Sequence, residues 1–471
     1  MLFNSYPFVF VFLPLVLAGF AILSYGRART AVVAFLTLAS LAFYAWWNWT
    51  FVPLILFSIL FNFSWGTLLQ RQRVRERGGA AEKGRRLLAL GVAVNLGLLG
   101  YFKYRNFLID SVAMALGTGW QLPPLVLPLA ISFFTFEQIT YLVDAYHADT
   151  GEYDFLSYCL FISFFPHLIA GPIVRFKQLV PQFAAAATFV FSESNLATGL
   201  FIFAIGLFKK VMIADTFSPW VAPIFDRVPA VGFSDAWGAT LAFTLQLYFD
   251  FSGYTDMAIG LALMLNIRLP ENFDSPYQAH SIIDFWRRWH MTLSNFLRDY
   301  LYIPLGGNRK GSVRRYTNLF ITMLLGGLWH GASWTFVLWG GLHGLYVAIN
   351  HLWRRAGIRL PAVISWAATF LAVMVGWVFF RAPSLQRAQV VLAGMAGLHG
   401  FAWQHFPYSI GGNRFKLLLP ALAVVLWCPN RQTIMQWRWQ NDYVYAAAFA
   451  LLAGLSILRL GDPSPFLYFQ F

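Results

Sequence analysis

The stretch from Ser281 to His343, SIIDFWRRWHMTLSNFLRDYLYIPLGGNRKGSVRRYTNLFITMLLGGLWHGASWTFVLWGGLH, decides how the rest of the chain is interpreted. It places two histidines, His290 and His330, in a sequence that otherwise consists mostly of apolar runs. An ionisable side chain at membrane depth costs about 2.5 kcal/mol or more unless it is paired or lines a cavity. The two histidines therefore mark the first place to look for function.

The composition is that of an integral membrane protein. The chain has 471 residues, of which 58% are hydrophobic and 11% are charged, whereas ordinary soluble domains carry about 25% charged residues. The polar loops between the apolar runs are too short to bury a core of their own. We therefore expect one membrane domain over residues 1–471, with its motif core at 281–344.

Apolar runs of the length needed to cross a bilayer recur along the whole chain. A spanning helix takes about 20 residues, and several of the runs are too short or too interrupted by Gly and Pro to be plain spans. We predict an all-α, multi-span helical bundle of about 11 transmembrane helices with additional re-entrant or interfacial helices. The candidate spans are 7–24, 31–47, 50–69, 87–103, 123–146, 155–171, 196–214, 236–264, 317–333, 334–351, 362–380, 417–429 and 443–459.

The basic residues indicate an orientation rather than a nucleic-acid partner. The formal net charge is +14, but the Lys and Arg residues fall in short clusters between apolar runs, as the positive-inside rule requires. The cluster at 70–86 should be cytoplasmic, and so should the loop with Arg27 and Arg29, two crossings earlier. We therefore expect the N-terminus to be periplasmic. We also expect loops at Lys209 and Lys210 and at 287–315. Binding of nucleic acid is not expected.

His330 is the stronger of the two histidine candidates. A helix that leaves the basic loop at Tyr316 rises about 21 Å by His330, at ~1.5 Å per residue, which places the imidazole beyond the midplane of a core about 30 Å thick. Small and indole-bearing neighbours leave room for a ligand between flat apolar walls. The alternative is a histidine that only hydrogen-bonds a neighbouring helix in a tight packing site. These neighbours are Gly326, Gly327, Gly331, Trp329 and Trp334.

His290 lies in a different kind of segment. The pattern of 284–300, DFWRRWHMTLSNFLRDY, predicts one amphipathic helix in the cytoplasmic interface. Taken alone, His290 is best interpreted as an interface histidine with its polar tip in water. His343 follows two glycines and could face the same cavity as His330, whereas the other histidines lie near loops or stay undecided.

Other chemistry has little support in the sequence. No H-x-x-x-H or H-E-x-x-H spacing is present, so we predict no metal site, and Cys159 and Cys428 give no disulfide framework. Asp250 and Asp256 lie inside an apolar run, where each needs a partner such as Arg or His. The alternatives are structural pairing and a proton path, and we expect both carboxylates to be structural. No G-x-S-x-G elbow indicates a serine hydrolase.

The motif pair resembles a known enzyme family. FWRRWHMTLSNFLRDYLYIPLGGNRKG followed by NLFITMLLGGLWHGASWTFVLWGGLHG is similar to the membrane-bound O-acyltransferases. FPHLIAGPIVRF, KKVMIADT, QLYFDFSGYTDMAIGLALML and the terminal SPFLYFQF resemble the branch that acetylates bacterial polysaccharides such as alginate. The resemblance covers nearly the whole chain up to Arg381 and is looser beyond it.

The resemblance implies a function in the bacterial inner membrane. It implies helices around a central tunnel, His330 as the catalytic residue, and His290 beside it to hold or polarise a donor thioester. Trp329, Trp334 and Trp289 are then candidates for substrate binding. The acyl donor would be acetyl-CoA, with no bound cofactor. The partners would be a periplasmic serine-dependent, SGNH-like acetyltransferase, the polysaccharide synthesis and export machinery, and the lipid bilayer.

Two alternatives stay open at this point. A D-alanyl transferase of the same family would carry the same two histidines. A proton-coupled membrane transporter belongs to a different class and would use intramembrane histidines as a proton relay. A transporter typically has inverted repeats with broken helices in matching halves, and no repeat is visible in this sequence.

Overall fold

A computed structural model describes most of the chain, and its fold is all-helical. Helices account for 79% of it, and no strand occurs among the described residues. This confirms the predicted all-α class. The described residues are 1–26, 28–75, 81–147, 150–151, 153–227, 229–401, 415–428, 430–436, 442–461 and 466–467.

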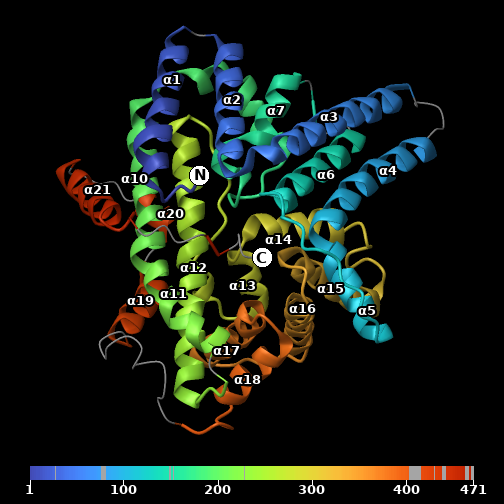
Figure 1. Ribbon diagram of the computed structural model, residues 1–471, viewed down its shortest axis with the longest axis vertical. Coiled ribbons are helices and arrows are strands. Elements are labelled where there is room, and N and C mark those ends of the chain that lie inside the picture. The colour runs from blue at the N-terminus through green and yellow to red at the C-terminus, as the bar shows by residue number, and fades with distance from the viewer. Residues whose placement is uncertain are drawn as a thin grey trace. The chain divides into compact units, whose positions relative to one another are not determined.

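The chain divides into two compact units, each described here by itself. The first comprises Met1–Phe203 and Thr255–Pro270. In it α3 and α4 both pack against α6, and α2 packs against α7 (Figure 1). The helices are η1 (Phe8–Phe12), α1 (Leu13–Tyr25), α2 (Arg29–Asn48), η2 (Trp49–Phe51), α3 (Val52–Arg75), α4 (Ala81–Leu99), η3 (Gly100–Tyr104), α5 (Arg105–Leu116), α6 (Ile131–His147), α7 (Phe155–Ser163), α8 (Phe165–Leu168), α9 (Phe176–Ala184), η4 (Ala186–Phe189) and α10 (Glu193–Phe208), whose end continues into the second unit.

The second unit comprises Ala204–Tyr254 and Glu271–Phe471 and contains both histidine candidates. Its best-packed helix pair is α15 with α16, and α16 also packs against α17 (Figure 1). The helices are η5 (Lys209–Ala214), α11 (Asp215–Ala222), η6 (Pro223–Arg227), α12 (Phe233–Met264), whose residues from Thr255 on belong to the first unit, η7 (Pro276–Gln278), α13 (Ile282–Arg288), α14 (Met291–Leu297), η8 (Arg298–Tyr302), α15 (Gly311–His330), α16 (Trp334–Arg355), α17 (Ala362–Arg381), α18 (Leu385–Met395), α19 (Phe415–Trp427), α20 (Arg431–Gln436) and α21 (Asp442–Ile457).

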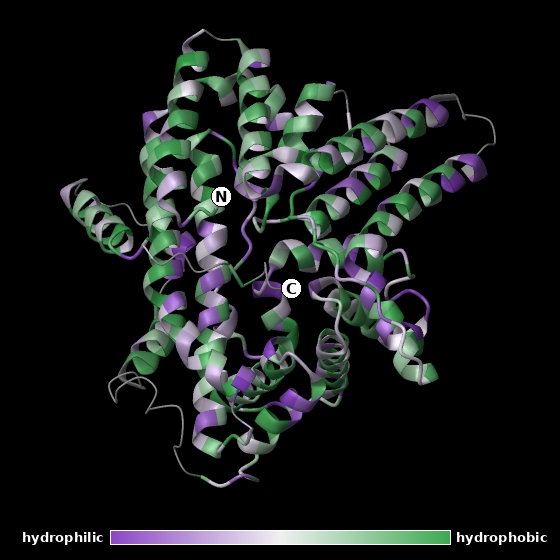
Figure 2. Cartoon of the chain, in the orientation of Figure 1, coloured by the Kyte–Doolittle hydropathy of each residue, from purple (hydrophilic) through white to green (hydrophobic). Residues whose placement is uncertain are grey.

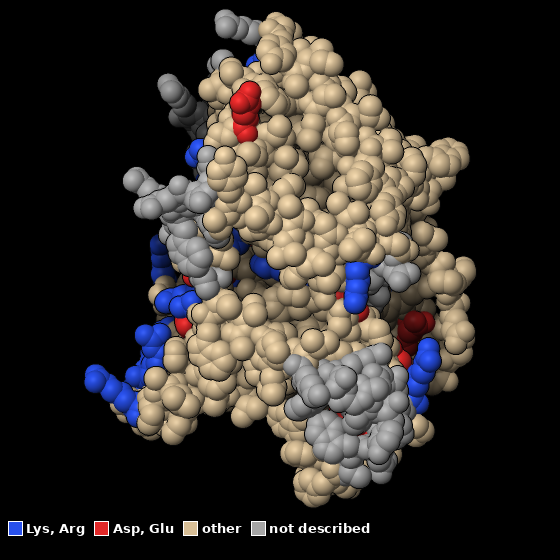
Figure 3. Space-filling model, turned by 90° about the vertical axis from the view of Figure 1, so that its left-hand side faces the viewer, with Lys and Arg blue, Asp and Glu red and all other residues tan. Residues whose placement is uncertain are grey.

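The helices have the surface expected of a multi-pass membrane protein. Hydrophobic residues run along most of them (Figure 2), and most of the surface in view in Figure 3 carries neither acidic nor basic side chains. Five helical segments of the described chain are long and apolar enough to span a bilayer, so the predicted count of about 11 is not confirmed. They are Phe8–Tyr25, Arg29–Gln72, Glu82–Leu116, Glu193–Arg227 and Ala362–Arg381. The single-domain expectation stays a prediction.

Several predicted spans differ from the observed helices. The span at 123–146 begins as a helix only at Ile131, and the span at 155–171 is broken at Phe164, whose ψ of 105° ends α7. The predicted loop at Lys210 is wrong, because this lysine is buried in η5. Some predicted features lie outside the described residues. They are Arg27, residues 76–80 of the basic cluster at 70–86, His405, and the terminal motif apart from Phe466 and Leu467.

Candidate active site

His330 is positioned by the closest helix packing in its unit. It is the last residue of α15, which ends at the extended Gly331, and α16 then begins at Trp334. A Cβ placed on Gly327 would lie 2.3 Å from the carbonyl oxygen of Phe336, so only glycine allows α15 and α16 to approach this closely. His330 itself is 4% exposed. The glycines noted in the sequence therefore bring two helices together at the histidine.

His290 does not lie in a continuous amphipathic helix, so that prediction is wrong. The helix breaks between α13 and α14, and His290 occupies the break with φ 43° and ψ 55°. This left-handed conformation is uncommon for a residue other than glycine and is often found at functional sites. The imidazole is 0% exposed, which corrects the expectation of a polar tip in water. The turn directs the side chain into the protein interior.

Asn272 fixes which nitrogen of His290 carries the proton. The side-chain oxygen Oδ1 of Asn272 accepts from the backbone N–H of Thr292 at 3.3 Å and from its hydroxyl at 2.9 Å. A backbone N–H can only donate, so the Asn272 atom must be the oxygen. The Nδ1 atom of His290 lies 3.1 Å from that oxygen and must donate to it. In the neutral ring Nε2 is then the acceptor.

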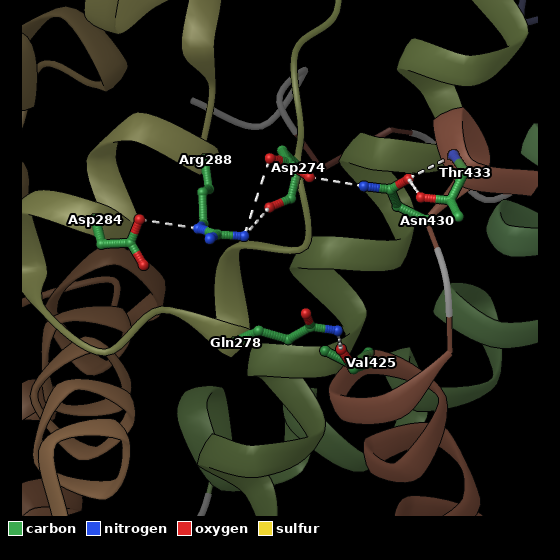
Figure 4. Close-up of polar contacts among 7 residues, drawn as sticks. All are labelled: Asp274, Gln278, Asp284, Arg288, Val425, Asn430 and Thr433. Atoms are coloured by element: carbon green, nitrogen blue, oxygen red, sulfur yellow. Dashed lines mark hydrogen bonds and ion pairs between the residues drawn. The ribbon is translucent and has the colours of Figure 1, made fainter. Parts of the chain in front are cut away.

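The segment that carries Asn272 is itself braced against α13 and α20. The amide of Asp274 donates to the carbonyl of Arg288 at 2.9 Å, and the amide of Met291 donates to the carbonyl of Asn272 at 2.9 Å. Figure 4 shows the guanidinium of Arg288 between Asp284 and Asp274. Asn430 donates to the carboxylate of Asp274 at 2.7 Å. The turn at His290 is thus held from both sides.

The two histidine rings lie near each other inside a group of aromatic side chains. Their ring centroids are 6.4 Å apart, and Trp329 lies 4.9 Å from His330 and 6.2 Å from His290. We call His290 and His330 the histidine pair. Its further aromatic contacts are Phe251 on His290 at 4.7 Å, and Trp339 and Phe380 on His330 at 5.2 and 5.4 Å.

The three tryptophans predicted to bind substrate occupy different places. Trp329 packs beside both histidines, at 4.9 Å from His330 and 6.2 Å from His290 between ring centroids. Trp289 is buried and packs against Phe285 and Trp377, at 5.7 and 5.0 Å between ring centroids. Trp334 is 46% exposed at the start of α16. Of the three, Trp329 is the one that the structure places against both histidines.

His343 joins the same aromatic group. It is fully buried, its ring lies 4.8 Å from Trp339, and its Nδ1 accepts from the indole N–H of Trp286 at 3.3 Å. The spacing of four residues from Trp339 on α16 places the two side chains on one helix face, which agrees with the suggestion that His343 faces the site. Sequence reasoning missed Asn272, Trp286 and Trp339.

Trp286 also lines a pocket of about 380 Å³. The pocket has an apolar interior, with Leu319, Met323 and Val347, and a basic lining from the loops and helix ends. We call it the arginine-lined pocket. Its cationic residues are Arg287, Arg298 and Arg315, and His351 accepts a hydrogen bond from Arg315 at 3.0 Å. Trp286 links the pocket to His330 through Trp339, because the ring centroid of Trp339 lies 5.8 Å from that of Trp286 and 5.2 Å from that of His330.

The predicted structural carboxylate Asp250 has a partner, but not the Arg or His that was expected. Its Oδ1 lies 2.7 Å from Nζ of the buried Lys210, and its Oδ2 accepts from the backbone N–H of Leu467 at 3.1 Å. Lys210 also pairs with Asp215 at 2.7 Å. Asp256 is 6% exposed. The described residues contain no group of three or more His, Cys, Asp or Glu able to hold a metal.

The first unit contains a buried histidine, His167, whose role the sequence left undecided. Nδ1 of His167 lies 3.1 Å from the carboxylate of Glu137, and both side chains are buried. Nε2 of His167 lies 3.1 Å from the carbonyl of Phe161. These contacts hold the broken segment after α7 against α6, which is a structural role.

This combination of an all-helical membrane fold and buried histidines belongs to a known class of enzymes. The model of the membrane-bound O-acyltransferase family matches residues 143–385. The chain belongs to this family and is an acyltransferase.

Relatives within the family carry related names. The chain is 39% identical to the peptidoglycan O-acetyltransferase of Helicobacter pylori, over 100% of this chain and 98% of the relative. It is 47% identical to the probable alginate O-acetylase AlgI of Pseudomonas aeruginosa, over 82% of this chain and 73% of the relative. The teichoic acid D-alanyltransferase of Streptococcus thermophilus is 28% identical over 48% of this chain and 57% of its own length.

Proposed function

We propose that this acyltransferase moves acetyl groups from cytoplasmic acetyl-CoA toward the periplasm, for O-acetylation of an exported polysaccharide such as alginate or cellulose. The observation that carries the proposal is the histidine pair, two buried imidazoles 6.4 Å apart in an aromatic group. Relatives named for alginate and peptidoglycan O-acetylation over most of the chain support acetyl as the transferred group.

His330 acts as the general base in the proposed reaction. The acceptor hydroxyl gives its proton to His330 as its oxygen attacks the thioester carbonyl carbon. When the C–S bond breaks, His330 returns the proton to the leaving thiolate, so that an ester and a free thiol result. A neutral imidazole suits this step because it can accept a proton at neutral pH. A transient acyl-His330 is the less favoured variant of this step.

His290 supports the reaction as a hydrogen-bond acceptor. Since Nδ1 donates to Asn272, Nε2 has no N–H with which to polarise a thioester oxygen. This argues against polarisation of the donor thioester by His290, the role that the family resemblance implies. We assign Nε2 instead to accepting a hydrogen bond from the imidazolium that forms at His330, directly or through a group bound between the rings. Trp329 then provides the wall along which that group lies.

The arginine-lined pocket is the proposed entrance for the donor. Its basic lining suits the phosphates of a coenzyme, and guanidinium groups bind phosphate oxygens in a bidentate manner. Its apolar interior suits the thioester arm, and Trp286 connects it to Trp339 beside His330. On this proposal the chain lies in the inner membrane with a periplasmic N-terminus. A periplasmic SGNH-like acetyltransferase takes over the acetyl group for transfer to the polymer.

The experiment compares two donors on washed membranes that contain the protein. Acetyl-CoA labelled in the acetyl group should yield labelled acceptor and free CoA, in amounts that follow the level of the protein. A D-alanyl carrier thioester should not replace it. Transfer from the D-alanyl carrier alone would instead establish the second candidate, which the D-alanyltransferase relative favours.

A further inference from the structure

A second hollow in the same unit lies between α16 and α17 and is lined by a different set of residues from the arginine-lined pocket. It has a volume of about 610 Å³, within the ~300–1,000 Å³ typical of small-molecule sites. The two helices pack against each other and are joined by residues 356–361. We call this hollow the α16–α17 groove. The two hollows share no lining residue among those described.

The groove is polar and basic at one end. Arg354 lies in the last turn of α16, and Arg359 lies in the connection to α17, so both are at the loop end. Both arginines are exposed at this end, where Asn350 and His280 also line the groove. None of the described lining residues is acidic. An anion at this end would therefore meet two cations and no carboxylate.

The groove becomes apolar away from the loop. Tyr346 and Ile349 line it from α16, and Ala368 and Ala372 line it from α17, at helical spacings of three and four residues. The eight residues from Arg354 back to Tyr346 correspond to about 12 Å of helix. The small side chains on α17 leave room along this length for a chain-like group.

The margins of the groove are apolar and exposed. Ile349, Trp353, Ile358 and Leu360 line it, and each exposes 40% or more of its surface. In a membrane protein, exposed apolar side chains beside an apolar channel face acyl chains rather than water. A water-soluble anion would use the basic end and leave the apolar length unfilled.

We propose that the α16–α17 groove binds one anionic phospholipid, with the headgroup phosphate between Arg354 and Arg359 and an acyl chain along α16 and α17. Basic pockets between transmembrane helices recognise anionic headgroups in this way. The inference does not depend on the acyl donor or acceptor, since the groove shares no lining residue with the arginine-lined pocket.

The test measures lipid binding to the purified full chain. Phosphatidylglycerol and phosphatidylcholine are added separately in detergent, and native mass spectrometry gives the dissociation constant of the first bound lipid. Phosphatidylglycerol should bind more tightly. Arg354→Gln with Arg359→Gln should raise its dissociation constant about 25-fold, at roughly 5-fold for each arginine near the surface.

Two further variants distinguish the groove from general charge effects. Arg309→Gln with Lys310→Gln removes the same charge from an exposed loop outside the groove and should leave binding unchanged. Ala372→Phe fills the apolar length while both arginines remain, and should also weaken binding. This variant keeps the proposal testable if the double arginine variant does not fold.

Four results would overturn the proposal. They are equal binding of the two lipids, unchanged binding in the arginine variant, unchanged binding in Ala372→Phe, and displacement of phosphatidylglycerol by either inorganic phosphate or acetyl-CoA. Displacement by phosphate would indicate a site for a soluble anion, and displacement by acetyl-CoA would indicate a donor site.

Discussion

Two groups of buried polar side chains in the second unit are built in different ways. In one, Lys210 lies 2.7 Å from both Asp215 and Asp250, and Asp250 also accepts from a backbone amide. In the other, the histidine pair is held by an amide side chain and by aromatic rings. In the first group an ammonium is paired with carboxylates. In the second, an amide side chain and aromatic rings hold two titratable rings in place.

The difference separates a structural role from a chemical one. A buried carboxylate paired with an ammonium is held in place by that partner, and breaking such a pair costs about 3–5 kcal/mol. A neutral imidazole in an aromatic group keeps the ability to accept and return a proton. The following experiments test this distinction, beginning with the largest expected effect.

Substitution of His330 should remove activity and leave the protein in the membrane. We expect His330→Ala and His330→Gln to lower acetylation of the exported polymer by about 10²–10⁴-fold, the usual contribution of a general base. The check is polymer acetyl content divided by the membrane level of each variant. Wild-type acetylation by either variant would contradict the assignment.

Asp250→Asn should lower the stability of the protein but not its activity, the opposite of the result expected for His330. It removes one of the two charged partners of the buried Lys210, which keeps Asp215, so we expect the protein to lose about 1–3 kcal/mol of stability. Turnover per folded molecule should stay close to that of the wild type. Thermal unfolding and activity of the surviving protein measure the two effects. A stable, abundant Asp250→Asn protein without activity would show that the carboxylate takes part in the reaction.

Asn272→Leu should lower turnover about 10–100-fold, by analogy with the partners that orient metal-bound histidines. The variant removes the oxygen that receives the proton of His290, so the ring is no longer confined to one tautomer. Thr292→Val is the matched control, because it removes one donor to the same oxygen but leaves the His290 bond intact. Equal loss of turnover in the two variants would argue against a role for Asn272 in holding His290 in one tautomer.

The smallest effects should come from two adjacent glycines on α16. A Cβ on Gly340 would lie 2.4 Å from the carbonyl oxygen of Met323, whereas one on Gly341 would meet only Phe320, at 3.6 Å. Gly340→Ala should separate α15 from α16 and cost about 1–3 kcal/mol. Gly341→Ala should have little effect on the melting temperature or on activity. Similar melting temperatures for the two variants would contradict the close packing.

The sequence was informative where local pattern determines structure. The helical class follows from long apolar runs, and His330 could be singled out because glycines and tryptophans surround it within a few residues of the chain. Gly326, Trp329 and Gly331 are near His330 in the chain as well as in space. Its placement therefore required no knowledge of distant contacts.

The surroundings of His290 could not be predicted in the same way. The segment has a clear amphipathic pattern, but the backbone breaks at His290 because Asn272 and Asp274 pair with both sides of the turn. Those residues lie outside the motif, and nothing in the helical periodicity indicates them. The partner of Asp250 was missed for a similar reason, since Lys210 lies 40 residues earlier (250 minus 210) and was assigned to a loop.

The measurement that tests the central claim most directly is acetyl transfer across inverted membrane vesicles, in which the cytoplasmic face is outward. Labelled acetyl-CoA is added outside, and labelled ester is measured in the lumen at matched levels of wild-type and His330→Gln protein of equal thermal stability. The wild type should transfer label, and the variant should do so at least about 100-fold more slowly. Equal transfer by the two proteins would contradict the role of the histidine pair.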